Sequence, residues 1–283
     1  MFTINPFSEL SGFISPLTMQ AYVIVMILLV AGGTILDMIH KKSAQYFFEN
    51  SKNQQKNATR TVSSGEKASV AIKTVANEVL TSSEFSNPKR RLSHLFTMYG
   101  FILFVATTAI MIFGYTSPGV TTPVILPLLW HLGALMLCFG GYWFWFFIRV
   151  DIFSEGKLWY HLVRADLFIL SLLSTATFAL IWSFLQSIGP SGATTLAFVL
   201  FIGAATVLFG GVLWSKFAHM FFKPAAAFQK RVTKADGSVE NLPDLPELTD
   251  PALQEKFPDI PEYMGKNPPN MGPGIKRETP NHY

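Results

Sequence analysis

The chain has 283 residues, of which 50% are hydrophobic and only 14% are charged. Soluble domains carry about 25% charged residues, so this composition excludes an ordinary soluble domain and indicates a membrane protein. The formal net charge of +4 comes from basic residues that collect on one side of the apolar stretches. It is therefore a signal of membrane topology and not of nucleic-acid binding.

Five apolar stretches are long enough to cross a bilayer. About 20 helical residues span the ~30 Å hydrocarbon core, because each residue adds about 1.5 Å. The first stretch lacks the basic leader of a secretory signal, so we interpret it as a retained helix. The expected fold is an all-α membrane protein with a five-helix transmembrane bundle. In chain order, the predicted spans cover residues 17–39, 94–115, 123–149, 160–186 and 194–222.

The basic residues predict the orientation of the bundle. Residues 1–16, 116–122 and 187–193 contain no Lys or Arg, and all 22 basic residues lie at the other ends of the spans. Positive residues remain in the cytoplasm. The N-terminus is therefore expected outside and the C-terminus in the cytoplasm, as an odd number of spans requires.

The polar segments divide the chain into four parts. Apolar residues at helical spacing predict a short amphipathic helix near residues 66–83. The C-terminal tail holds 10 of the 17 prolines and an acidic middle. Such a sequence cannot bury a core of its own, so we expect it to be disordered or ordered by a soluble partner. The parts are an N-terminal segment with the first span (1–39), a cytoplasmic loop with the amphipathic helix (40–93), four further spans (94–223) and a cytoplasmic Pro-rich docking tail (224–283).

Histidines are the candidate cofactor ligands. Cys138 is the single cysteine, which excludes an internal disulfide, a Cys-liganded iron–sulfur cluster and a c-type haem attachment within this chain. His94 opens the second predicted span, and His219 lies near the end of the fifth, on the same side. Two imidazoles on facing helices form a low-spin haem site, so this pair is a candidate ligand set for the iron of one haem b. The alternative is that headgroups solvate both residues at the interface.

Other polar residues lie near the same face. Lys216, one turn before the last-span histidine, is a candidate contact for a haem propionate or a residue that extends to the headgroups. Arg164 and Asp166 are expected to pair with each other, or to contact a propionate or a quinone. His161 is either a substitute ligand or a member of the interfacial aromatic belt.

Little else in the chain predicts chemistry. His131, near the outer start of the third span, has no opposite histidine at its level, so an outer haem is not expected there. It could instead bond a quinone carbonyl. The sequence has no Walker A loop, nucleophile elbow, HExxH motif or paired carboxylates in the spans, so no catalytic site of its own is predicted. The unbroken spans do not fit a transporter.

Three segments resemble a known family. Residues 88–101 (PKRRLSHLFTMYGF) and 214–224 (WSKFAHMFFKP) are similar to the second-helix opening and last-helix signature of cytochrome b subunits in the nitrate reductase gamma and heterodisulfide-reductase-like group. Within that group the tail at 263–277 (YMGKNPPNMGPGIKR) resembles the membrane anchors of dissimilatory adenylylsulfate reductase. The resemblance covers roughly residues 80–283.

The resemblance implies a role in bacterial sulfur oxidation, at the inner (cytoplasmic) membrane. The soluble partner would be a flavin and iron–sulfur enzyme that interconverts adenylylsulfate with sulfite and AMP. Its electrons would pass through this subunit, by way of haem b, to membrane quinone. The sulfur chemistry would belong wholly to the partner.

The chain departs from the family at the outer haem. Two-haem members carry further histidines at places that correspond here to Phe104 and Phe201, and neither neighbourhood contains one. At most the inner site, His94 with His219, is expected. Two alternatives remain: a haem-free structural anchor, or a cytochrome b-type subunit of another nitrate-reductase-like or heterodisulfide-reductase-like complex.

Overall fold

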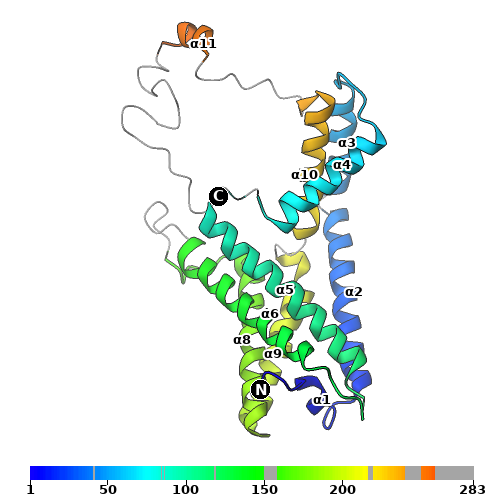
Figure 1. The fold of residues 1–283 in the computed structure, drawn as a ribbon, viewed down its shortest axis with the longest axis vertical. Coiled ribbons are helices and arrows are strands. Elements are labelled where there is room, and N and C mark those ends of the chain that lie inside the picture. The colour runs from blue at the N-terminus through cyan, green and yellow to red at the C-terminus, as the bar shows by residue number, and fades with distance from the viewer. Residues whose placement is uncertain are drawn as a thin grey trace.

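The computed structural model describes residues 1–40, 42–83, 85, 87–117, 119–149, 158–215, 219–239 and 250–258, and every regular element in these ranges is helical. Five of the described helices are long and apolar enough to cross a membrane, which confirms the predicted fold class (Figure 1). They are α2 (Pro16–His40), α5 (Pro88–Gly114), α6 (Ile125–Trp143) with its π-helical extension η2 (Phe144–Ile148), α8 (Leu167–Ile188) with the preceding 3-10 turn η3 (Arg164–Asp166), and α9 (Gly192–Gly210).

The fifth span ends earlier than the sequence predicted. The helix was expected to run to residue 222, but α9 ends at Gly210 and is followed by the 3-10 turn η4 (Val212–Trp214). Two consecutive glycines, 210 and 211, weaken a helix at this point because they restrict the backbone least. A separate helix, α10 (His219–Asp236), then begins. His219 therefore belongs to α10 and not to α9.

The docking tail was predicted to start at residue 224, and the structure shows a helix that crosses this position. Pro224 lies inside α10, which continues to Asp236. This helix holds its position by packing outside the bundle: the Gln229 side chain donates a hydrogen bond to Gln54 at 3.0 Å, and the Thr59 backbone N–H donates to the Asp236 carbonyl at 2.9 Å.

A layer of helices covers one end of the bundle, where α2 ends and α5 begins (Figure 1). We call this the basic end and the layer the end layer. The predicted amphipathic helix near residues 66–83 is confirmed as part of it, because α4 runs directly into the π-helical η1. The end layer consists of α3 (Ser43–Gln55), α4 (Ser64–Thr74), η1 (Val75–Leu80) and α10.

The first turn of α4 is stabilised by hydrogen bonds between residues that are close in sequence. The Ser63 hydroxyl accepts a hydrogen bond from the Glu66 N–H at 3.2 Å, and the Glu66 carboxylate accepts one from the Ser63 N–H at 3.3 Å. This is a capping box, which satisfies two otherwise unpaired donors. Hydrogen bonds from the Arg60 side chain and from the Ser63 backbone lower the pKa of Glu66, so the cap stays charged at neutral pH.

Glycines bring α5 and α6 into close contact. A methyl group added at Gly133 would lie 2.7 Å from the Phe104 backbone nitrogen, and one added at Gly100 would lie 2.8 Å from the Gly133 carbonyl oxygen. Near the basic end, the Ser93 hydroxyl donates to the Gly140 carbonyl at 2.8 Å. Small residues allow this backbone approach, which drives helix association where both helices are apolar.

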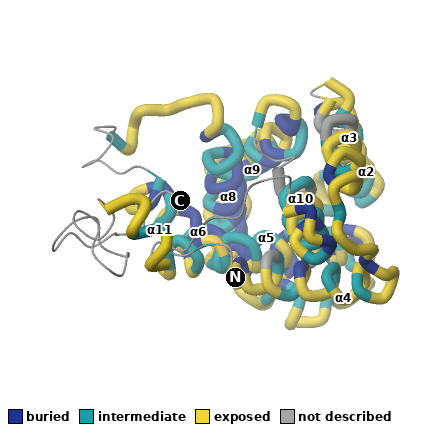
Figure 2. Tube along the Cα trace, turned by 90° about the horizontal axis from the view of Figure 1, so that it is seen from above, coloured by how far each residue is buried: buried dark blue, intermediate teal, exposed yellow. Residues whose placement is uncertain are grey.

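The first span, α2, stands at one side of the other four. Only 17% of its most apolar 18-residue stretch is buried, compared with 50% for α8. Figure 2 shows the same difference, with buried residues on α8 and exposed ones along α2. Its contacts include Gly33, where an added methyl group would meet the Val212 side chain at 3.0 Å.

At the opposite end, the N-terminal residues close the bundle. The short helix α1 (Pro6–Leu10) places the buried Phe7 ring 5.9 Å from Trp130 and 5.5 Å from Trp182. The Asn5 side chain donates to the Tyr115 carbonyl at 3.3 Å and to the Thr122 hydroxyl at 3.1 Å.

A buried ion pair joins α6 to α8 at the basic end. Arg149 and Asp166 are bonded through two nitrogen–oxygen contacts, of which Nε to Oδ1 is 2.8 Å, and their side chains are only 9% and 10% exposed. The same guanidinium lies 4.1 Å from the centre of the Trp145 ring and donates to the His161 carbonyl at 2.7 Å. The expected pairing of Asp166 with Arg164 is therefore wrong: Arg164 is exposed.

Replacing Gly133 with alanine should destabilise the bundle by about 1–3 kcal/mol, because the new methyl group overlaps the backbone of α5. The Gly203→Ala variant is the control, since a methyl group there would meet nothing within 4 Å. Thermal unfolding of both variants in lipid nanodiscs would measure the difference. Equal melting temperatures would contradict the close contact.

Replacing Arg149 with alanine should lower the free energy of unfolding by about 3–5 kcal/mol, because it leaves the buried Asp166 carboxylate without its cation. Arg164→Ala removes an exposed cation from the same segment and should cost no more than about 0.5 kcal/mol. Denaturant titration in mixed micelles compares the two. A larger loss for Arg164→Ala would mean that the pairing is wrong.

Candidate functional site

His94 lies in the second turn of α5, where the end layer meets the bundle. Its Nδ1 lies 3.0 Å from the Ser82 hydroxyl, and its ring centre lies 4.9 Å from that of Phe85. The helix positions it firmly, because α5 begins with Pro88 and the Asn87 side chain caps its first turn. His94 itself is exposed. It therefore faces the segment that links the end layer to α5 and is not enclosed between the spans.

The ring of Phe85 connects His94 to the start of α10. The Lys223 ammonium lies 4.8 Å from the centre of this ring, on the side of α10, and the Arg90 guanidinium lies 5.4 Å from it. Lys223 is one turn after His219 along α10. The fold thus brings His94 and the first turn of α10 into one cluster, although the side chain of His219 lies outside the described part of the chain.

The end layer is fastened to α5 beside this cluster. The Arg91 side chain donates to the Thr81 carbonyl at 2.7 Å, and the Tyr99 hydroxyl donates to the Leu80 carbonyl at 2.7 Å. Both acceptors lie at the end of η1, so three hydrogen bonds, with that of Ser82, hold the amphipathic helix over the start of α5. A substitution of His94 would therefore disturb the packing of the end layer on α5.

Two of the remaining predicted residues, His161 and Arg164, lie outside the cluster. Lys216 lies outside the described residues, as do positions 217 and 218. His161 and Arg164 are exposed, and the segment 158–163 before α8 is not helical. Their backbone is nevertheless ordered by the buried ion pair, because Arg149 bonds to the carbonyl of His161.

His94 suits a haem ligand in one respect. Histidines that bind metals usually have their other ring nitrogen hydrogen-bonded, which fixes the ring. Here Ser82 engages Nδ1, so ligation would use Nε2. Among the described residues, no group of three or more His, Cys, Asp or Glu side chains could hold a metal ion. Among the described side chains, that of His94 could supply one axial ligand to a haem.

Aromatic rings surround Phe104 and Phe201, the positions at which the resemblance would place a second ligand pair. Phe104 stacks on Trp130 with 5.1 Å between ring centres, and Phe201 stacks on Trp182 at 5.6 Å. The rings of Phe104 and Phe201 face each other edge-on at 6.4 Å. We call these four residues, with Phe7 and Phe198, the aromatic cluster. One histidine, His131, lies beside the aromatic cluster, with its ring centre 4.9 Å from that of Trp130.

His131 is a structural residue of the same region. It is 1% exposed, its Nδ1 lies 2.7 Å from the Pro127 carbonyl, and its Nε2 lies 2.8 Å from the Ser183 hydroxyl. A carbonyl only accepts, so Nδ1 carries the proton, and the hydroxyl donates to Nε2 of the neutral ring. The Nδ1 bond lies within α6 and the Nε2 bond joins α6 to α8, so both nitrogens already have partners, which does not support the expected bond to a quinone.

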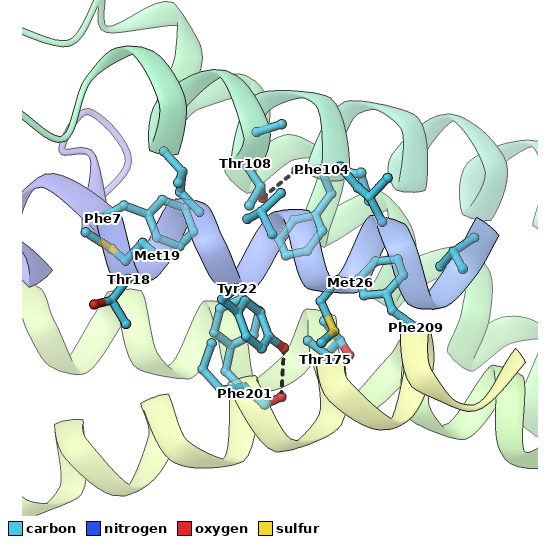
Figure 3. Close-up of a pocket in the computed structure, with 18 of the residues that line it drawn as sticks. Phe7, Thr18, Met19, Tyr22, Met26, Phe104, Thr108, Thr175, Phe201 and Phe209 are labelled. Atoms are coloured by element: carbon cyan, nitrogen blue, oxygen red, sulfur yellow. Dashed lines mark hydrogen bonds between the residues drawn. The ribbon is translucent and has the colours of Figure 1, made fainter. Parts of the chain in front are cut away.

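A large apolar cavity lies between α2 and the other spans. Its volume is about 830 Å³ and it is partly open to the outside; Figure 3 shows α2 and aromatic side chains of α5 and α9 along its wall. We call it the lateral cavity. It exists because α2 makes few contacts with its neighbours apart from positions such as Tyr22, whose hydroxyl lies 3.0 Å from that of Thr206. Phe104 and Phe201 of the aromatic cluster form part of its wall.

Sequence reasoning missed several residues of these sites. Asp37 is 5% exposed in the last turns of α2, and a carboxylate so far within an apolar stretch was a signal that could have been noticed. Thr34, one turn earlier, lines the lateral cavity. Ser82 and Phe85 carry no local pattern that points to His94, because their contacts depend on how the end layer folds back.

Comparison with known proteins adds no relative. No protein-family model, no curated protein and no solved structure matches this chain.

Proposed function

We propose that this protein is the membrane anchor of a cytoplasmic adenylylsulfate reductase and that it passes electrons between that enzyme and the quinone pool. The observation that carries this proposal is the end layer, a folded helical surface outside the spans at the basic end, joined directly to His94. By the positive-inside rule this end faces the cytoplasm. The resemblance of the tail at 263–277 favours the adenylylsulfate reductase anchors within the broader group.

The end layer exposes apolar side chains that a protein partner would cover. Phe48, Ile72, Val75 and Leu80 are 66%, 70%, 49% and 49% exposed on helices outside the spans. Exposed apolar groups that are rimmed by polar residues mark sites of protein association. A further contact with the partner would come from the Pro-rich segment after Val239. Within this segment the structure describes α11 (Pro251–Lys256). Its acidic residues would recruit basic surfaces of the soluble enzyme.

The residues around His94 are suited to the electron path. A bound haem b would supply one-electron transfer between the soluble iron–sulfur centre and the quinone. His94, held by Ser82 and Phe85, would be one ligand, and His219 at the start of α10 the other. Lys223 and Arg90, both against the Phe85 ring, place positive charge where propionates would lie. The sulfur chemistry remains with the partner.

A haem-free structural anchor is the second candidate. It is favoured by the exposure of His94 at the end of the bundle, because haem sites in bundles lie between facing helices. In this case electrons would pass from the docked partner to quinone directly. The end layer and tail would have the same docking role in both cases. A subunit of another nitrate-reductase-like or heterodisulfide-reductase-like complex would use the same scaffold with a different partner.

The visible spectrum of the purified chain separates the two candidates. The reduced-minus-oxidised spectrum should show one b-type band, and His94→Ala and His219→Ala should each abolish it, because bis-His ligation needs both imidazoles. His161→Ala, which removes an exposed histidine near the same end, should leave the band unchanged. Absence of any b-type band in the parent protein would establish the haem-free anchor.

Removal of residues 240–283 should release the soluble reductase from membranes, because the docking tail begins after α10 and not at Pro224. Ile72→Glu should weaken the remaining association by about tenfold, since it places a charge in an exposed apolar patch of the end layer. Ser69→Glu adds the same charge one turn earlier at an exposed position and serves as the control. Co-sedimentation of the flavin and iron–sulfur subunits with vesicles measures both. Full retention after truncation would contradict a docking tail.

A further inference from the structure

We propose that the lateral cavity is the binding site of an isoprenoid quinone, with the quinone ring at Thr34 and the isoprenoid chain along α2 toward the opposite end. This inference rests on the proposed function, because it assigns the place where quinone meets the protein. The cavity is a property of the described helices alone and does not depend on the haem.

The shape of the lateral cavity fits a long flexible molecule. Along α2 its lining runs from Thr18 to Ile35, which corresponds to about 26 Å of helix at 1.5 Å per residue. Its wall is formed almost wholly by aliphatic and aromatic side chains. An isoprenoid chain has the same character, and small-molecule sites are usually apolar clefts with few polar groups that fix orientation.

The polar group that would fix the ring is the Thr34 hydroxyl. Its oxygen is buried and has no hydrogen-bond partner, although Thr34 lines the cavity. Burying a hydroxyl without a partner is unfavourable, so such groups in folded proteins call for an explanation. A quinone carbonyl accepts hydrogen bonds and would satisfy this donor.

The other hydroxyls in the wall are already used. The Thr18 hydroxyl lies 2.9 Å from that of Ser15, and the Thr108 hydroxyl donates to the Phe104 carbonyl at 2.7 Å. The dashed lines in Figure 3 mark the bonds of Thr108 and Tyr22. The remaining pairs are Thr175 with the Ser171 carbonyl at 2.7 Å and Tyr22 with the Thr206 hydroxyl at 3.0 Å. Thr34 is thus the one lining hydroxyl described without a bond.

The position of Thr34 suits electron entry from the basic end. It is six residues before the end of α2 at His40, close to the face that carries the end layer. The rings of Phe101 and Phe209, with 6.3 Å between their centres, belong to the cavity wall and offer flat apolar surfaces to a ring. His94 precedes Phe101 by seven residues and so lies on the same face of α5.

A lipid acyl chain is the competing occupant. The apolar wall would accept it, but an acyl chain has no acceptor along its length for the Thr34 hydroxyl and no flat ring for the aromatic wall. Quinone binding differs measurably from filling by lipid. It should saturate, and it should depend on both the free volume of the lateral cavity and the Thr34 hydroxyl.

The test is equilibrium binding of decylubiquinone to the full chain in phosphatidylcholine nanodiscs, read by quenching of tryptophan fluorescence. Trp130 and Trp182 are suitable reporters because they stack on Phe104 and Phe201 in the cavity wall. Saturable quenching is expected. Ala109→Phe, which fills the cavity, should weaken binding at least about tenfold, whereas Ala106→Phe makes the same change at an exposed position of α5 outside the lining and should match the parent.

The hydroxyl is tested separately. Thr34→Val should weaken binding by about two- to tenfold, the range for one neutral hydrogen bond, and Thr34→Ser should restore it. Quenching that does not saturate, or that is alike in Ala109→Phe and Ala106→Phe, would overturn the proposal in favour of a lipid chain.

The same variants separate this site from the proposed function. Binding is measured without the partner, and quinone reduction by the reconstituted reductase complex is measured second. Saturable binding without partner-linked reduction would reject the proposed function and keep the site. Reduction that proceeds equally in Ala109→Phe and in the parent would keep the function and reject the site.

Discussion

The close contact of α5 with α6 determines how the rest of the molecule is arranged. Gly100 and Gly133 let the two backbones approach to distances that no other residue would allow. In an apolar solvent no hydrophobic force drives helices together, so such packing and internal hydrogen bonds decide their association. With one face of α5 packed on α6, the neighbouring face, which carries Phe101, Val105 and Ile112, lines the lateral cavity beside α2.

The two ends of the bundle are secured by different means. At one end, the N-terminal residues contribute Phe7 to the aromatic cluster, where its ring lies against Trp130 and Trp182. At the basic end, a buried pair of Arg149 and Asp166 orders the segment before α8, and an amphipathic helix is tied to α5 by side-chain bonds. Strong polar contacts are thus confined to the ends, while the centre relies on packing, as the cost of unsatisfied groups in a bilayer requires.

In our proposals, docking and ligand binding use separate parts of the molecule. The end layer and the Pro-rich segment offer surfaces for a soluble enzyme, and the loosely attached α2 leaves a long apolar space beside the bundle. His94 lies between these regions. An anchor that moves electrons from a soluble donor to a lipid-soluble acceptor needs both surfaces at the same end, and the proposals above follow from that juxtaposition.

The sequence by itself determined the five spans and the amphipathic helix, because hydrophobic length and periodicity are local properties. The resemblance also pointed to Phe104 and Phe201, which lie together in the aromatic cluster. Only the tertiary structure decided that the last span stops at Gly210, that His219 belongs to a separate helix and that Asp166 pairs with Arg149 instead of Arg164. These outcomes depend on contacts between residues far apart in the chain. The lateral cavity and the unbonded hydroxyl of Thr34 also depend on tertiary structure, because the cavity lies between helices that are distant in sequence and do not pack closely.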